Sequence, residues 1–226
     1  MMEIGIIGSG NIGSTLAGYL TALGHQVMIA NSRGPKSLGN IAAKTGATAV
    51  TTEEAAGATD LIILAIHKAI VNLPKELLSA SKAKIVDAGN YYPSRDGQIA
   101  DIQAGLTDSE WVAKVIGHPV IKAFNNIVAP SLASKAIPTG SPNRIALSVA
   151  GDDQQQKQIV IDLIYEIGFD AIDGGTLSES WRQQPGAPAY CQDLDRGSLK
   201  NALQKADITQ RDESRAKADE MARPYL

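Results

Sequence analysis

The sequence predicts an α/β fold in which a doubly wound, mostly parallel sheet carries a short helical extension at its C-terminal end. Three observations predict it. A glycine-rich turn lies between a strand and a helix at the N-terminus, strands and helices then alternate, and one strand is apolar without interruption. The alternation ends near residue 175, so we expect one sheet domain over residues 1–175 and an extension over residues 176–226 packed on it.

Composition limits the functions that the chain can have. The 226 residues are 44% hydrophobic and 20% charged, with a formal net charge of −3 and 4% aromatic residues. These values disfavour nucleic acid as a partner, because they offer neither a basic surface nor an aromatic platform for bases. No stretch approaches the about 20 apolar residues of a membrane span, so we expect no membrane partner.

The chain has a single cysteine, Cys191. One cysteine cannot form an internal disulfide, which indicates a reducing compartment and a cytoplasmic protein. We interpret Cys191 as a small buried residue rather than a nucleophile, because the sequence places no base beside it.

The glycine-rich turn follows a short apolar strand around Gly5. It has the pattern G-x-G-x-x-G, with Gly8, Ser9, Gly10, Asn11, Ile12 and Gly13 in order, and residues 12–23 follow as a helix. The first glycine permits a turn that a Cβ would obstruct. The second glycine allows the backbone to approach a pyrophosphate closely, and the third allows the helix to pack closely on the sheet. The helix N-terminus would hold the anion. A tight turn without a ligand is the alternative interpretation.

A second strand over residues 26–30 completes a β-α-β unit of about 30 residues, typical of a Rossmann-type dinucleotide fold. An NAD site usually carries Asp or Glu after this strand, whereas this chain has Asn31, Ser32, Arg33 and, after Gly34-Pro35, Lys36. The basic side chains and the hydroxyl suit a 2′-phosphate, so the sequence favours NADP(H) as cofactor. A solvated basic turn is the alternative.

The remaining elements follow in order. We predict strands at residues 47–50, 60–66, 84–87, 120–124, 144–150 and 169–173, and helices at 37–45, 52–56 (with Thr52 near its cap), 74–79, 109–116, 129–135 and 154–167. The uninterrupted run at 60–66 marks a strand buried on both faces. Residues 94–108 read as a polar loop with a helical piece. The extension reads as a proline-interrupted loop over 184–190 followed by polar helices at 199–206 and 209–221.

Several candidate cofactor-binding residues lie at or just after the carboxyl ends of strands, where open α/β sheets bind ligands. They are Ala65, Ile66 and His67 at the end of one strand, Gly89 and Asn90 after the next, and Asn125 after the sixth. The two amides suit the nicotinamide carboxamide or ribose, although asparagine is also a common turn residue. His67 is the one weak catalytic candidate, and a polar loop residue is an equal interpretation.

Other reactive residue types have structural interpretations. His25 and His118 are expected to be structural, and the three histidines show no metal-ligand spacing, so we assign no metal site. Asp152 and Asp153 could suggest a metal, but we interpret this pair as the N-cap of the helix that starts at residue 154. Trp181 and Tyr190 either line an acceptor pocket or pack the extension onto the domain.

The chain resembles the deazaflavin-dependent NADP reductase family (NADP oxidoreductases of the coenzyme F420-dependent type). It is also similar to the related cytosolic oxidoreductase domain of the six-transmembrane metalloreductases. The resemblance rests on five segments between residues 4 and 175: residues 8–13, 31–33, 87–90, 122–125 and 149–153.

The resemblance implies a Rossmann fold that binds NADPH in extended form, with Ser32 and Arg33 on the 2′-phosphate. The loops that start at Ile66, Ala88 and Ala123 would line the nicotinamide end. It further implies hydride transfer to a flavin or deazaflavin, which needs no proton-transfer residue because the cofactors carry the chemistry.

We therefore expect an NADPH-dependent oxidoreductase whose small-molecule acceptor is a flavin, a deazaflavin or a similar compound. One alternative is an NADP-dependent reductase of a small carbonyl or imine. Such enzymes usually carry a large helical C-terminal domain, and a homodimer could supply its equivalent from the partner's last helices. A non-catalytic NADP-sensing module is the other alternative.

Overall fold

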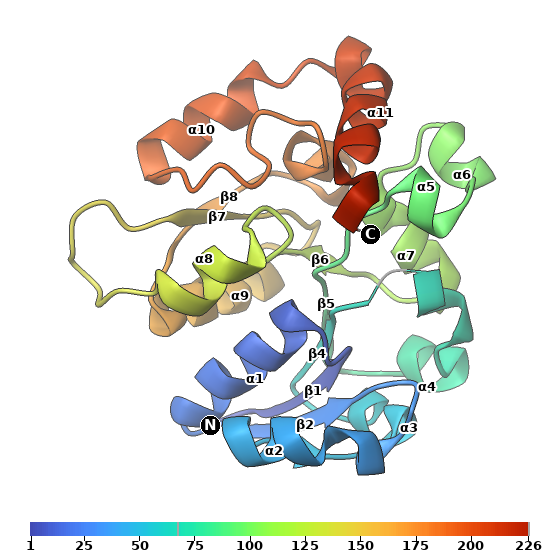
Figure 1. Ribbon diagram of the computed structural model, residues 1–226, viewed down its shortest axis with the longest axis vertical. Helices are drawn as coiled ribbons and strands as arrows, with labels where there is room; N and C mark the ends of the chain where they lie inside the picture. The colour runs from blue at the N-terminus through green and yellow to red at the C-terminus, as the bar shows by residue number, and fades with distance from the viewer. Residues whose placement is uncertain (67, 226) are drawn as a thin grey trace. The chain divides into compact units, whose positions relative to one another are not determined.

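A computed structural model of the chain describes residues 1–66 and 68–225 (Figure 1). His67, the weak catalytic candidate, lies outside the described residues. The chain forms two compact units. The first comprises residues 1–89 and 112–120, and the second comprises residues 90–111 and 121–226.

The first unit is built on parallel strands in the order β3-β2-β1-β4-β5. In chain order they are β1 (Glu3–Ile7), β2 (Gln26–Ala30), β3 (Thr48–Ala49), β4 (Leu61–Leu64) and β5 (Lys84–Asp87). β1 pairs with β2 from Glu3 opposite Gln26, and with β4 from Ile4 opposite Leu61. The strand order reverses between β1 and β4, so the carboxyl ends of these two strands form the topological switch point of a doubly wound sheet. The predicted fold class is confirmed.

Apolar patterning explains the core of this unit. All four residues of β4 are fully buried, as expected for a strand covered on both faces. Leu16, Ala17 and Leu20 of the first helix are fully buried as well. The helical segments of the first unit are α1 (Asn11–Ala22), η1 (Pro35–Leu38), α2 (Gly39–Thr45), α3 (Thr52–Ala56), η2 (Lys68–Asn72) and α4 (Lys75–Ser79).

The bounds of α3 are as predicted, and Thr52, which was expected near the cap, is the first residue of the helix. The cap itself is Thr51, because Thr51 and Glu54 form a capping box. The Thr51 hydroxyl accepts the Glu54 N–H at 3.2 Å, and the Glu54 carboxylate accepts the Thr51 N–H at 2.8 Å. Two consecutive threonines offered two possible caps, and the glutamate three residues after the first one decides between them.

The second unit contains a separate sheet of two parallel strands, β7 (Ala146–Val149) and β8 (Asp170–Asp173). Helices α9 (Gln154–Ile167) and α10 (Arg196–Lys205) both contact the two strands, and Figure 1 shows them on opposite sides. Before them, β6 (Ile121–Lys122) makes one antiparallel bridge, Lys122 with Ala150. Leu199 and Leu203 of α10 pack with Ala146 of β7 in one hydrophobic cluster of this unit.

The bounds of α9 are as predicted, and so is its cap. The Asp153 carboxylate accepts the N–H groups of Gln155 and Gln156 at 2.9 and 3.0 Å. Such a cap removes two of the unpaired donors of the first turn.

The polar segment over residues 94–108, predicted as a loop with a helical piece, contains two short helices. They are α5 (Pro93–Asp96) and α6 (Ala100–Gln103), and α7 (Asp108–Ile116) follows. Pro93 starts α5, and Gly97, at φ 78°, ends it. Both α5 and α6 are only four residues long, which is about one turn. Periodicity does not reveal helices of four residues.

The C-terminal segment is helical, as predicted. It comprises η3 (Leu177–Gln183), α10, η4 (Ile208–Gln210), α11 (Arg211–Ala222) and η5 (Arg223–Tyr225), with α8 (Ala129–Ser134) earlier in the same unit. α10 begins three residues before the predicted start because Asp195 caps it, accepting the Ser198 N–H at 2.7 Å. Across the described residues, none of the helices has the length and apolar character needed to span a membrane.

Candidate dinucleotide site

Gly8 stands where β1 ends, and its geometry excludes a side chain. Its φ of 121° is a conformation that only glycine adopts readily. A Cβ at this position would overlap the backbone carbonyl of Ala65 and lie 2.8 Å from the Ile66 side chain. The turn after β1 therefore lies directly against the residues that follow β4. This contact brings together two of the segments that the sequence assigned to the cofactor.

The other two glycines of the motif differ in what surrounds them. A Cβ on Gly13 would overlap the Gly8 carbonyl oxygen and lie 3.3 Å from the Ala65 Cβ, so this glycine allows α1 to pack closely on the turn. Gly10, by contrast, faces open space, with no described atom within 4 Å of a Cβ built there.

The N-terminus of α1 fits the pyrophosphate of a dinucleotide. Gly10 is its N-cap, no side chain of the described residues caps the helix, and its first turn contains no acidic residue. Its first N–H groups and the positive end of the helix dipole are thus available to an anion beside open space.

Asn31 links the glycine turn to the basic turn after β2. Its amide Nδ2 donates to the hydroxyls of Ser9 and Ser37, both at 3.0 Å, and its Oδ1 accepts the Arg33 N–H at 2.9 Å. Asn31 occupies the position at which NAD sites usually carry a carboxylate, and its side chain holds the two turns together. Ser37 was not among the predicted site residues, because a serine inside a predicted helix gives no signal of its own.

The basic side chains of this turn are available for binding. Ser32, Arg33 and Lys36 are all exposed. Neither Arg33 nor Lys36 forms an ion pair with any residue that the structure describes. An unpaired guanidinium with its planar set of donors is suited to a phosphate.

The residues after β5 fall on both sides of the unit boundary. Gly89 belongs to the first unit, and its N–H donates to the Asp87 carboxylate at 2.9 Å. Asn90 and Asn125 belong to the second unit and lie side by side there. The Asn125 amide donates to Asn90 Oδ1 at 3.0 Å.

Asn125 is held by a residue that the sequence did not single out. Its Nδ2 donates to the Gln183 carbonyl at 2.7 Å, and its Oδ1 accepts from Gln183 Nε2 at 2.8 Å. Asn125 is only 2% exposed, so its amide is committed to these internal hydrogen bonds. The preceding residue, Phe124, has a φ of 62°, which is unusual for a bulky residue and marks a locally strained backbone.

The structure gives the other reactive side chains structural surroundings. His25 Nδ1 accepts the Met2 N–H at 3.1 Å, and both ring nitrogens of His118 contact backbone carbonyls, those of Pro119 and Ser81. Burial raises the pKa of the Cys191 thiol to about 11, so the thiol is protonated at neutral pH. A protonated thiol is a poor nucleophile, in agreement with the interpretation that Cys191 is not a nucleophile. Within the described residues, no group of three or more histidine, cysteine or acidic side chains is placed to hold a metal ion.

Comparison with known proteins identifies the family. A protein-family model described as NADP oxidoreductase, coenzyme F420-dependent, matches residues 3–91, which contain the glycine turn and the basic turn. The crystal structure of SMa0349, a hypothetical protein from Sinorhizobium meliloti, superposes on this chain with a TM-score of 0.73. The two sequences are 33% identical, and the match covers 87% of this chain and 96% of that one. The chain belongs to this NADP oxidoreductase family.

Further relatives agree with this assignment. Metalloreductase STEAP3 from Rattus norvegicus is 29% identical over 180 residues, which are 79% of this chain and 35% of that protein. Putative protein YjhV from Escherichia coli is 40% identical over 67 residues, or 30% of this chain and 49% of YjhV. The chain thus spans half or less of these curated relatives.

A solved structure described as a putative F420-dependent NADP-reductase from Arthrobacter sp. shares the fold. It has a TM-score of 0.66 at 23% identity, over 80% of this chain and 87% of that one. At this identity the likeness shows that the two chains share a fold.

Proposed function

We propose that the protein is an NADPH-dependent oxidoreductase that transfers a hydride between NADP(H) and a flavin, a deazaflavin or a similar acceptor. The observation that carries the proposal is the connection between the two turns of the first unit. Asn31 holds the glycine turn and the unpaired basic turn in one arrangement, which supports a pyrophosphate site and a 2′-phosphate site next to each other.

Each part of the cofactor has a proposed partner in this chain. The N–H groups at the start of α1 would bind the pyrophosphate, and the open space at Gly10 admits its close approach. Ser32, Arg33 and Lys36 would bind the 2′-phosphate. NADPH supplies the hydride chemistry when bound, so the protein has to bind and orient two ring systems rather than move protons.

The nicotinamide end is proposed to involve Asn90. Because the Asn125 amide is committed to Asn90 and Gln183, we assign Asn125 the role of fixing Asn90. Asn90, which exchanges hydrogen bonds with Asn125, would then be held in place for the carboxamide or ribose.

We also propose a cytoplasmic location, because a single cysteine cannot form a disulfide within the chain.

The test begins with nucleotide binding. A charge-assisted hydrogen bond is worth about 1.5–3 kcal/mol, so Arg33→Ala should weaken NADPH binding about ten- to a hundredfold while hardly changing the affinity for NADH. Lys44→Ala, which removes an exposed lysine of α2, is the matched control and should bind NADPH as the wild type does. Equal losses for both nucleotides would contradict the assignment of Arg33.

The acceptor is identified by turnover. Purified protein with NADPH is offered flavins, a deazaflavin, quinones, ferric complexes, small carbonyls and imines, and loss of the reduced-nicotinamide absorbance is followed. Turnover with a flavin or deazaflavin supports the proposal. Turnover confined to carbonyls or imines would replace it with the reductase alternative, and tight NADPH binding without any turnover would indicate a sensing module.

A further inference from the structure

The second unit contains a cavity that the proposed function does not use. It has a volume of about 100 Å³ and lies between the end of η3, the proline-containing loop and the start of α11. For comparison, a cavity of about 150 Å³ holds a benzene ring. Because this one opens to solvent, it suits a small ring with one end exposed.

The wall formed by the proline-containing loop is rigid. Pro185 and Pro188 fix the backbone on either side of Gly186, which has a φ of 89°. A Cβ on Gly186 would overlap the Ser214 carbonyl of α11, so the loop and the helix are in direct contact there. Trp181 adds a flat apolar surface to the lining. A site that is already shaped loses little entropy on binding.

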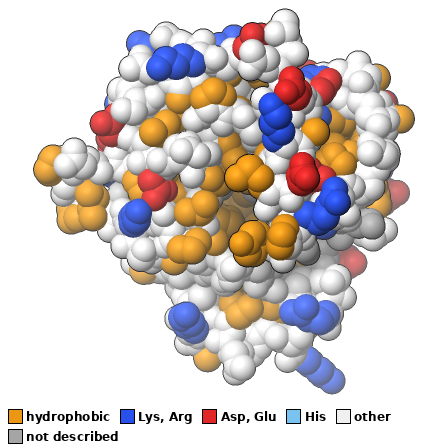
Figure 2. Space-filling view, turned by 45° about the horizontal axis from the view of Figure 1, so that its top comes forward, with side chains coloured by type: hydrophobic (Ala, Val, Ile, Leu, Met, Phe, Trp, Pro, Cys, Tyr) orange, Lys and Arg blue, Asp and Glu red, His pale blue; other side chains and the backbone are white. Residues whose placement is uncertain are grey.

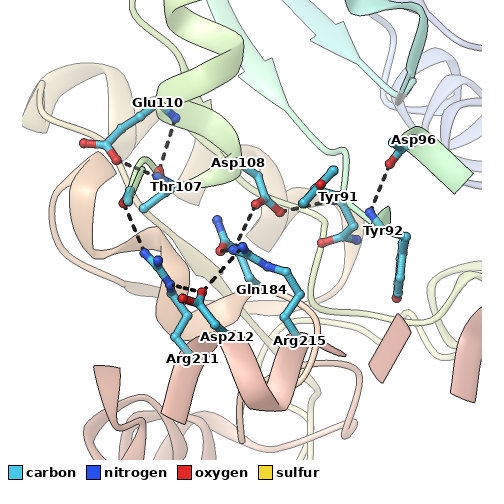
Figure 3. A network of polar contacts seen from close by, with 12 residues as sticks. Tyr91, Tyr92, Asp96, Thr107, Asp108, Glu110, Gln184, Arg211, Asp212 and Arg215 are labelled. Atoms are coloured by element: carbon cyan, nitrogen blue, oxygen red, sulfur yellow. Dashed lines mark hydrogen bonds and ion pairs between the residues drawn. The ribbon is translucent and has the colours of Figure 1, made fainter. Parts of the chain in front are cut away.

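Two residues of the lining each contain a buried donor atom that lacks a partner. Gln184 is 1% exposed and Arg215 is 6% exposed, and Gln184 Nε2 and Arg215 Nε have no hydrogen-bond partner among the described residues. The orientation of the Gln184 amide is fixed, because its Oε1 accepts from Arg215 Nη2 at 2.9 Å and a guanidinium can only donate (Figure 3). Its amide nitrogen therefore remains a donor. Buried polar groups of this kind usually have a partner.

The charges of the lining also favour an acceptor with negative charge. Three lining side chains are basic (Lys205, Arg211 and Arg215) and one is acidic (Asp207). Arg215 pairs with Asp108 at 3.3 Å and Arg211 pairs with Asp212 at 2.9 Å, whereas Lys205 forms no ion pair with the residues described. Asp207 Oδ1 is itself occupied by the N–H and hydroxyl of Thr209.

We propose that this cavity binds a small planar carboxylate, whose ring lies against Trp181 and whose oxygens accept hydrogen bonds from Gln184, Arg215 and Lys205. The site lies wholly within the second unit and does not depend on bound NADPH. It is a binding site in addition to the dinucleotide site, and it takes a ligand of a different class.

Benzoate is the probe, with benzamide as an uncharged ring of the same shape and acetate as a carboxylate without a ring. Binding is measured by calorimetry on the full chain, and the indole N–H resonance of Trp181 in labelled protein reports the location. We expect saturable benzoate binding with a Kd of about 1 mM or tighter, and binding of benzamide and acetate at least about tenfold weaker.

Variants separate the site from general effects. Gln184→Glu keeps the shape and the contact with Arg215 but replaces the donor with a carboxylate, so it should weaken benzoate at least about tenfold. Lys205→Ala changes an exposed residue, leaves folding intact, and should weaken benzoate about two- to fivefold. Lys217→Ala, an exposed lysine of α11 outside the lining, should have no effect.

Three results would overturn the proposal. They are absence of saturable benzoate binding, equal affinities for benzoate and benzamide, and unchanged benzoate affinity in both Gln184→Glu and Lys205→Ala. None of them bears on NADPH, whose binding is titrated separately in each variant and is expected to equal that of the wild type.

Discussion

The three glycines of the motif should respond differently to the same substitution, because their surroundings differ. Gly10→Ala is the informative change. Gly10 has φ −72° and ψ −173°, an extended conformation open to any residue, and the space beside it is empty. Alanine is a poorer N-cap than glycine, but it also restricts the unfolded chain, and these opposing terms are each about 0.5–1 kcal/mol. We therefore expect the free energy of unfolding to change by less than about 1 kcal/mol.

The same methyl group should impair the cofactor site. It would occupy the space through which the turn approaches the pyrophosphate, and would remove at least one N–H-to-phosphate hydrogen bond worth about 1.5–3 kcal/mol. NADPH binding should weaken about ten- to a hundredfold. Nucleotide fluorescence titration measures the affinity, and urea unfolding measures the stability of the same preparation.

Two comparisons make the result interpretable. Gly8→Ala should lose stability by about 2–5 kcal/mol, because backbone strain at φ 121° adds to the overlap with Ala65. Gly197→Ala, at an exposed glycine near the start of α10, should leave NADPH binding unchanged. If Gly10→Ala binds NADPH as tightly as wild type, the assignment of this turn to the pyrophosphate is refuted.

Three further predictions follow from side chains in the structure. Asn31→Ala should weaken NADPH binding by about tenfold through loss of the link between the two turns, with a stability loss of only about 1 kcal/mol; a large loss of stability with normal binding would contradict it. Cys191, with its pKa raised to about 11, should react with a thiol reagent at pH 7.5 at least about a hundredfold more slowly than free cysteine, and a rate that levels off near pH 8.5 would contradict this. For Asp173, burial raises the pKa, but hydrogen bonds from Lys157 and the Gly175 N–H outweigh it and lower the pKa overall. The resulting stability is present above the unfolded pKa of about 3.9 and is lost as the pH falls through the lower folded value, so Asp173→Asn should flatten the acid limb of the unfolding curve below about pH 4.

The features predicted correctly from the sequence are those whose cause is local. The glycine turn, the apolar run of β4 and the Asp153 cap of α9 each depend on residues within a few positions of one another. The cap of α3 also has a local cause, because Glu54 lies three residues after Thr51 and completes a capping box with it. The short helices α5 and α6 could not be predicted from periodicity, since one turn of helix contains no repeat.

Contacts between distant residues had no such signal. Asn125 and Gln183 are 58 positions apart, and nothing in the proline-containing stretch around Gln183 indicates that its amide pairs with Asn125. Arg215 and Asp108 are 107 positions apart, and in the sequence Arg215 is one charge among many in a polar helix. Each pair becomes recognisable only when folding buries both partners, because a buried amide or guanidinium requires hydrogen bonds that a solvated one obtains from water.

This difference explains why the hydride donor is easier to assign than the acceptor. NADPH binds proteins through its phosphates, and phosphates are bound by backbone N–H groups and basic side chains that lie close together in the sequence, as we propose for residues 8–13 and 31–36. A flat acceptor ring is bound mainly through apolar surface and a few polar groups, which distant segments contribute. Trp181 shows the consequence, because the sequence left it between lining a pocket and packing the extension. The structure places it in the lining of the additional cavity of the second unit, together with Gln184, Lys205 and Arg215, and only that set of side chains indicates the class of ligand to test at this cavity.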